Sequence, residues 1–190
     1  MGQQFTELQD KHSDFIAKQQ MFFVGTAAEQ GRVNISPKGS DSFRVVNKNQ
    51  VIWLNLTGSG NETSAHVQIN PRMTIMFCAF AGAPIILRLY GQAQVLHRND
   101  PLWQSYISLF PASIAARQLY LLDIDLVQSS CGMSVPLFDF KQQRTALADW
   151  SEKQGEQGIE AYWLKKNQQS IDGFDTNIAN LAGLATNNNE

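Results

Sequence analysis

Four short strand-like runs follow one another closely in the N-terminal third of the chain, and their spacing constrains the fold more than any other feature. They are Met21–Ala27, Arg32–Ser36, Phe43–Val46 and Val51–Thr57. Only a few turn-forming residues separate each run from the next. A crossover between parallel strands needs about a dozen residues, usually a helix, and these connections are too short to hold one. The spacing therefore predicts antiparallel hairpins and argues against a doubly wound parallel sheet.

The rest of the sequence mixes longer strand patterns with short helical ones. Apolar runs predict further strands at Arg72–Phe80, Ile85–Leu96 and Tyr120–Ser129. Helices are expected over 5–16, 62–70, 146–152 and 159–167, with one more beginning at Asp100. Strands interrupted by a few short helices predict a barrel-like α+β fold.

Composition limits the classes of function. Charged residues make up 17% of the 190 residues and the formal net charge is −2, so we expect no nucleic-acid partner. Hydrophobic residues reach 43%, more than the core of one monomer needs, which favours a subunit interface. The N-terminus lacks the pattern of a secretory signal, and no apolar stretch approaches the roughly 20 residues that cross a bilayer. We therefore expect a cytoplasmic protein with no membrane partner.

Cysteines and histidines offer few candidates for covalent or metal chemistry. The two cysteines, Cys78 and Cys131, lie far apart, which excludes a disulfide framework and a four-cysteine zinc site. No two histidines stand at helical i, i+4 spacing, so we expect no metal site. Cys131 lies in a turn-rich stretch after a strand, where a structural role and a contact with substrate both stay open.

A glycine-containing loop between a strand and a helix is a candidate anion site. The segment Gly58–Ser64 would direct backbone N–H groups at the start of the following helix, where unpaired donors and the helix dipole attract phosphate. The side chains of Asn61, Thr63 and Ser64 could add hydrogen bonds. The same loop is equally consistent with an ordinary capped helix.

Three cations lie where an anion or a ring system could meet them. Ser36 and Lys38 share one turn with a glycine, and Arg44 begins the next expected strand. Arg88 interrupts an apolar run, and a buried arginine needs either a carboxylate partner or a bound anion. Both explanations of Arg88 stay open.

Four motifs follow one another along the chain: Val33–Gly39, Gly60–Thr63, Asn70–Arg72 and Leu87–Ala93. In this order they resemble the pyridoxamine 5′-phosphate oxidase-like superfamily of FMN-binding split barrels, and the last is similar to the superfamily's R-x-x-G-x-A strand. The sequence from Ser130 to Gly173 resembles an uncharacterised bacterial branch of that superfamily.

The resemblance implies a fold, a cofactor and an assembly. It implies an α+β fold in which residues 1–136 form a mostly antiparallel split β-barrel that binds FMN. Residues 137–178 would form a helical extension packed on it, and 179–190 a poorly ordered tail. It also implies a homodimer that holds FMN in clefts at the subunit interface. The residues expected at the flavin or its phosphate are Ser36, Lys38, Arg44, Asn61, Thr63, Ser64 and Arg88, with Cys131 as a candidate contact to substrate.

The implied function is that of an FMN-dependent oxidoreductase that transfers hydride at flavin N5 and acts on an unknown small molecule. A flavin carries its own redox chemistry, so the protein need supply only binding, orientation and electrostatics. Lys38 or Arg44 would provide the cation near flavin N1 and O2. The alternatives are a non-catalytic flavin or haem binding or storage protein, and a domain that has lost its cofactor.

The chain departs from the vitamin B6 enzymes at one informative position. Glu62-Thr63 stands where those enzymes carry an Arg-Lys pair, and a carboxylate there would repel a phosphate dianion. Two outcomes are expected for Glu62: its side chain points to solvent, or it accepts a hydrogen bond from a backbone N–H at the helix start. Lys38, Arg44 or Arg88 must then supply the positive charge. The C-terminal arginine-rich motif of those enzymes is not apparent, so pyridoxamine phosphate is not the expected substrate.

Overall fold

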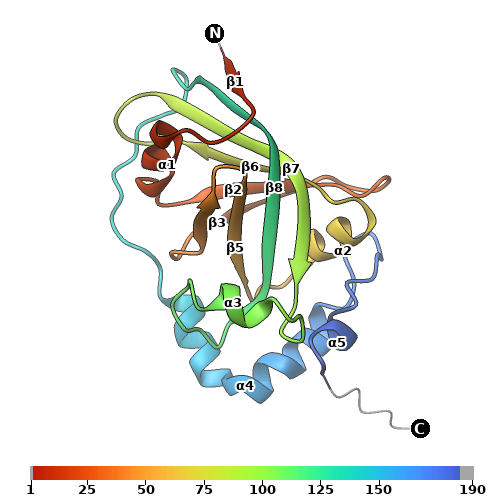
Figure 1. Cartoon of the computed structure of the whole chain (residues 1–190). Coiled ribbons are helices and arrows are strands. Elements are labelled where there is room, and N and C mark those ends of the chain that lie inside the picture. The colour runs from red at the N-terminus through yellow and green to blue at the C-terminus, as the bar shows by residue number, and fades with distance from the viewer. Residues whose placement is uncertain (1, 185–190) are drawn as a thin grey trace, which may run out of the picture.

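One antiparallel sheet of eight strands dominates the computed structural model, which describes residues 2–184 (Figure 1). The strand order is β3-β2-β6-β7-β8-β5-β4, and β1 pairs with the C-terminal part of β8. The sheet curls without closing, as the name split barrel implies. The strands are β1 (Gln3–Phe5), β2 (Phe22–Thr26), β3 (Asn34–Lys38), β4 (Phe43–Asn47), β5 (Gln50–Leu56), β6 (Arg72–Cys78), β7 (Ile85–Leu96) and β8 (Ala116–Cys131). The helices are α1 (Asp10–Ala17), α2 (Glu62–Ile69), α3 (Trp103–Ile107), α4 (Ala146–Lys166) and α5 (Ile178–Leu181).

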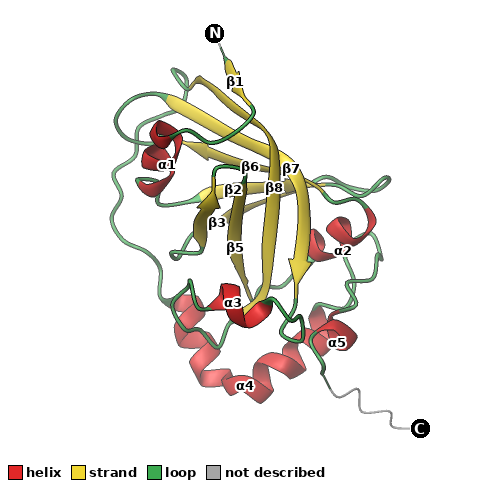
Figure 2. Ribbon diagram, in the orientation of Figure 1, coloured by secondary structure: helices red, strands yellow, loops and turns green. Residues whose placement is uncertain are grey.

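Alternating side chains along the strands form the main core. Successive residues of a strand point to opposite faces, and the inward set is fully buried. It includes Val24, Ile75, Leu89, Leu122 and Val127. Figure 2 shows that the helices lie at the ends and edges of the sheet, with α1 near the end that carries β1 and α3, α4 and α5 at the opposite end. The expectation of an antiparallel α+β fold is confirmed.

Gly91 occupies a place on β7 that no larger residue could take. The register between β7 and β8 shifts between Tyr90 and Gly91, which marks a β-bulge. A Cβ atom on Gly91 would overlap the backbone carbonyl of Asp123 on β8. The glycine of the R-x-x-G-x-A pattern, formed here by Arg88, Gly91 and Ala93, therefore allows the two longest strands to approach closely where they bend.

The C-terminal region packs against the sheet through its own apolar cluster. Ile159 and Trp163 of α4 meet Ile178 of α5 in this cluster, and the Trp163 indole N–H donates to Thr57 Oγ1 at 2.9 Å. Gly155 has φ 64° and interrupts α4, which agrees with the two separate helices expected in this region. The expected tail begins inside α5, and residues 185–190 lie outside the described part of the chain.

The starts of the first helix and of the last strand differ most from those expected, and the helix expected from Asp100 begins at Trp103. Phe5 was expected in the first helix, but residues 3–5 pair with β8 as β1, so the helix begins at Asp10. Strand β8 begins at Ala116, earlier than the expected start at Tyr120, because its first residues pair with β5. None of the helices in the described part of the chain combines the length and apolar content needed to cross a bilayer.

Candidate functional site

A polar cavity of about 260 Å³ lies where strands β3, β5 and β8 meet the start of α2. Four of the residues expected at a cofactor, Ser36, Lys38, Asn61 and Thr63, lie together in its wall. They come from β3 and from the helix entry, two segments that the antiparallel topology brings side by side. The other lining residues are Asn34, Asn55, Leu56, Gly58, Gly60, Glu62 and Arg117.

Arg117 is a buried cation that sequence reasoning missed. Only 3% of it is exposed, and within residues 2–184 it forms no ion pair. One guanidinium nitrogen donates to the carbonyls of Gly58 at 3.3 Å and Gly60 at 3.0 Å, and to Asn167 Oδ1 at 2.6 Å. Its Nε has no partner in the described structure. Burial lowers the pKa of the guanidinium to about 10, so it remains protonated at neutral pH.

Lys38 brings a second positive charge to the same cavity. Its ammonium donates to Asn55 Oδ1 at 3.3 Å and lies 5.2 Å from the ring centroid of Trp53. Burial, and then the nearby Arg117, lower the pKa of Lys38 to about 8. A buried and a half-buried cation, whose described partners are neutral or aromatic groups, form a site suited to an anion.

Within residues 2–184, Glu62 forms no ion pair with Lys38 or Arg117, although it lines the same cavity. Both of its carboxylate oxygens accept a hydrogen bond from the backbone N–H of Ile171, at 3.1 and 3.0 Å. The expectation of a bond from a backbone N–H at the helix start is wrong in its donor, because Ile171 belongs to the C-terminal segment. The one carboxylate among the described lining residues is thus hydrogen-bonded to a backbone N–H and not paired with Lys38 or Arg117.

The first turn of α2 adds neutral donors to the cavity wall. The opening N–H groups of a helix have no partner within the helix, and the helix dipole favours an anion there. Asn61 precedes this turn and is buried, and its Oδ1 has no partner among residues 2–184. Thr63 Oγ1 accepts a hydrogen bond from Asn34 Nδ2 at 3.3 Å, and the buried Ser36 Oγ likewise has no partner in the described part of the chain.

The remaining candidates from the sequence lie elsewhere. Ser64 is fully buried and its hydroxyl meets the carbonyl of Thr176 at 3.5 Å, outside the cavity wall. Arg44 pairs with Asp41 through two nitrogens, at 2.7 and 3.0 Å. Cys131 is exposed at the end of β8 opposite to Arg117.

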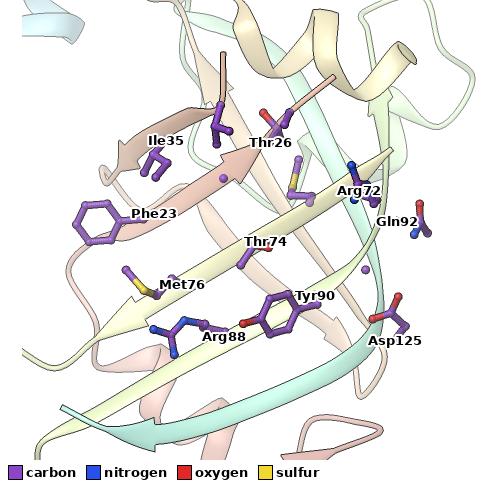
Figure 3. Close-up of a pocket in the computed structure, with 15 residues that line it drawn as sticks. Phe23, Thr26, Ile35, Arg72, Thr74, Met76, Arg88, Tyr90, Gln92 and Asp125 are labelled. Atoms are coloured by element: carbon purple, nitrogen blue, oxygen red, sulfur yellow. The ribbon is translucent and has the colours of Figure 1, made fainter. Parts of the chain in front are cut away.

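Arg88 lies on the outer face of the sheet, in a second and mostly apolar hollow of about 540 Å³ (Figure 3). Its guanidinium donates to Ser130 Oγ at 3.1 Å, within residues 2–184 it forms no ion pair, and it does not line the cavity of Lys38. Phe23, Met76 and Tyr90 project from neighbouring strands into the same hollow (Figure 3). At its edge, Val33 and Ile35 are 71% and 70% exposed, which is unusual for large apolar side chains.

The sequence around Arg117 contains a pattern that could have indicated a buried arginine. Arg117 follows Ala115 and Ala116 and precedes Gln118, a weaker form of the apolar pattern that marked Arg88. The expected start of the strand at Tyr120 placed Arg117 in a connection, where a solvated arginine is ordinary. Asn55 and Asn167 carried no comparable signal, because neutral amides are common throughout the chain.

Comparison with known proteins identifies the family. A family model described as pyridoxamine 5′-phosphate oxidase matches residues 8–131. The pyridoxamine 5′-phosphate oxidase family protein ustO from the fungus Aspergillus flavus is 34% identical, over 90% of this chain and 76% of its own. Group A Streptococcus HupZ resembles the fold with a TM-score of 0.51 at 17% identity, over 63% of this chain and 91% of its own. The structure of a Lactobacillus delbrueckii protein, provisionally described as a pyridoxamine 5′-phosphate oxidase, gives a TM-score of 0.52 at 16% identity. The match covers 65% of this chain and 94% of that protein. The two solved structures support the fold alone, whereas the family model and the fungal relative establish that the chain belongs to the pyridoxamine 5′-phosphate oxidase family.

Proposed function

We propose that the protein is an FMN-binding flavoprotein whose cavity at Lys38 and Arg117 holds the phosphate of the cofactor. The observation that carries the proposal is Arg117, a buried cation whose described acceptors are all neutral. Leaving such a charge without a counter-ion is costly, and a bound dianion would supply one. Family membership supports a flavin as the source of that dianion.

The groups around the cavity fit a phosphate. The unpartnered Nε of Arg117 and the unpartnered hydroxyl of Ser36 are free donors, and Lys38 offers an ammonium. The first turn of α2 offers backbone N–H groups. The carboxylate of Glu62 is held by Ile171, which limits its repulsion of an anion. These residues would replace the Arg-Lys pair expected from the vitamin B6 enzymes.

We propose an oxidoreductase acting on a small molecule of unknown identity. When bound, FMN would supply hydride acceptance at its N5 atom. The chain's own contribution is to anchor the phosphate through Arg117 and Lys38 and so to fix the position of the rest of the cofactor. Haem is a weaker candidate, because histidine is a common axial ligand of haem and all three histidines are buried.

The proposal includes a homodimer with its cofactor clefts between the subunits. The outer hollow supports it, because exposed Val33 and Ile35 form an apolar border beside Phe23. Sedimentation tests the assembly directly: a dimer has twice the mass of the 21.2 kDa chain. A monomer at micromolar concentration would rule out shared clefts. Val33→Glu with Ile35→Glu should shift a dimer toward monomer if this face forms the interface.

The absorption spectrum of the purified protein tests the cofactor. A flavoprotein shows the two visible flavin bands and releases FMN on denaturation. The apoprotein should bind added FMN at least tenfold more tightly than riboflavin, which lacks the phosphate. Arg117→Gln should remove this preference, while Lys153→Met, an exposed control substitution, should leave it unchanged. Equal binding of the two ligands by the wild-type protein would refute the phosphate assignment.

Reduction of the bound flavin by NADH or NADPH tests the proposed reaction class. Rapid bleaching of the visible bands, followed by reoxidation in air, is expected of an oxidoreductase. A protein that binds FMN but is reduced by neither nucleotide, nor by any small donor tested, would instead be a flavin store.

A further inference from the structure

Asn167 connects the C-terminal segment to three parts of the cavity wall. It is fully buried at the end of α4, beyond residues 8–131, which the family model matches. Its side-chain oxygen accepts from Arg117 at 2.6 Å, and its side-chain nitrogen donates to the carbonyls of Gly58 at 3.0 Å and Ser59 at 3.4 Å. Its backbone carbonyl accepts from Asn61 Nδ2 at 3.2 Å. One residue thus contacts the buried cation, the glycine loop and the residue that precedes α2.

The position of Asn167 is fixed by the packing beneath it. Its backbone N–H donates to the carbonyl of Trp163 at 2.8 Å, and Trp163 is anchored on Thr57 of the barrel. The Thr176 hydroxyl donates to the backbone carbonyl of Asn167 at 2.6 Å. The amide orientation is also determined, because its oxygen must face the guanidinium and its nitrogen must face the two carbonyls.

The neutral charge of the Asn167 side chain matters as much as its geometry. A carboxylate at this position would pair with Arg117 and cancel the charge that an anion needs. An amide oxygen instead orients the guanidinium while leaving its charge in place. The two backbone carbonyls that also contact Arg117 act in the same way. Every described acceptor of Arg117 therefore holds the cation without neutralising it.

We propose that Asn167 is a positioning residue that holds Arg117 and the Gly58–Asn61 loop in the geometry that binds phosphate. The C-terminal segment thereby completes the site and sets the preference for phosphorylated over unphosphorylated flavin. This inference rests on the proposed function, because it takes FMN as the ligand.

Asn167→Asp tests the inference with an almost isosteric change. It should lower FMN affinity at least tenfold and leave riboflavin affinity unchanged, because only the phosphate senses the neutralised Arg117. The control is Gln168→Glu, the same change of charge at the adjacent exposed position. It should alter neither affinity. Near-ultraviolet circular dichroism and urea unfolding establish that each variant is folded.

Asn167→Ser provides a second variant in case the aspartate substitution prevents folding. It removes the amide donors to Gly58 and Ser59, so Arg117 keeps its charge and loses its fixed position. The ratio of FMN to riboflavin affinity should again fall, by a smaller factor.

The possible failures are distinguishable. If wild-type protein prefers FMN and both folded variants keep the full preference, the role of Asn167 is refuted and the proposed function stands. If wild-type protein binds no FMN, the proposed function is refuted and this inference with it. A parallel loss of FMN and riboflavin affinity would assign Asn167 a purely structural role and would also overturn the inference.

Discussion

Replacing Lys38 by methionine should stabilise the ligand-free protein while weakening its affinity for FMN. Methionine keeps the length of the side chain and removes the charge. In the folded protein the Lys38 ammonium is largely withdrawn from water and lies near Arg117, and both effects disfavour its protonated form. The unfolded chain has no such penalty. The cation is thus retained at a cost in stability, which is the pattern expected of a ligand-binding group.

The magnitude follows from the shift in the pKa of Lys38, from 10.5 to about 8. At about 1.4 kcal/mol for each unit, the charged form is disfavoured by about 3 kcal/mol in the folded state. The substitution also removes the hydrogen bond to Asn55 and the contact with the ring of Trp53, which together contribute about 1–2 kcal/mol. The net expectation is a gain of about 1–2 kcal/mol in the free energy of unfolding at pH 7.

Urea unfolding at several pH values measures this effect. Because the folded-state pKa is the lower one, the unfolded chain binds more protons than the folded chain between about pH 8 and 10.5. The stability of the wild-type protein therefore rises with pH across this window relative to Lys38→Met, and the advantage of the variant disappears. Lys153→Met, at an exposed position, should differ little from wild type at any pH.

Two results would refute this reasoning. If Lys38→Met is less stable than wild type at pH 7 without ligand, the ammonium is stabilised by its surroundings instead of being disfavoured by them. If the two stability curves stay parallel from pH 7 to 10, Lys38 does not titrate in that window. In either case the folded protein would not disfavour the protonated form of Lys38, and the argument for an anion beside it would fail.

Three further outcomes are expected. Gly91→Ala should destabilise the protein by about 3 kcal/mol or more in urea unfolding, because the added methyl group would overlap the Asp123 backbone carbonyl on β8. A stability equal to that of the wild type would show that the close approach of β7 and β8 does not require glycine. Trp163→Phe should cost about 1–2 kcal/mol by the same assay, because the buried indole N–H donates to Thr57 Oγ1; an unchanged midpoint would show that this bond contributes nothing. FMN affinity, measured by flavin fluorescence, should fall as the pH rises from 7 to 10, because Lys38 loses its proton. An affinity independent of pH would show that Lys38 does not contribute to binding the phosphate.

The sequence allowed the local parts of the site to be predicted. The turn that carries Ser36 and Lys38 and the loop before α2 each have a local pattern, and the hairpin topology brings the two together. Arg44 could have been interpreted differently from the sequence alone. Asp41 stands three residues before it and pairs with its guanidinium, an interaction at short range that the sequence alone suggests.

The contacts that sequence reasoning missed are those made by tertiary packing. Whether Arg117 faces solvent or a cavity depends on the register between β5 and β8, which shifts after Asn55. A shift of one residue reverses which face a side chain occupies, and no local pattern marked it. Asn167 meets Arg117 only because α4 docks through Trp163, and an amide gives no periodic signal of such a role.

The hydrogen bond between Arg117 and Asn167 also has a consequence for the order of folding. The two residues are joined only after the chain has continued well past the last strand, so a growing polypeptide presents all eight strands before Asn167 is available. Until then Arg117 remains hydrated and the glycine loop lacks its amide donors. The strands can therefore pair during synthesis before Asn167 is in place, and under the proposed function the binding of FMN phosphate would follow the docking of α4.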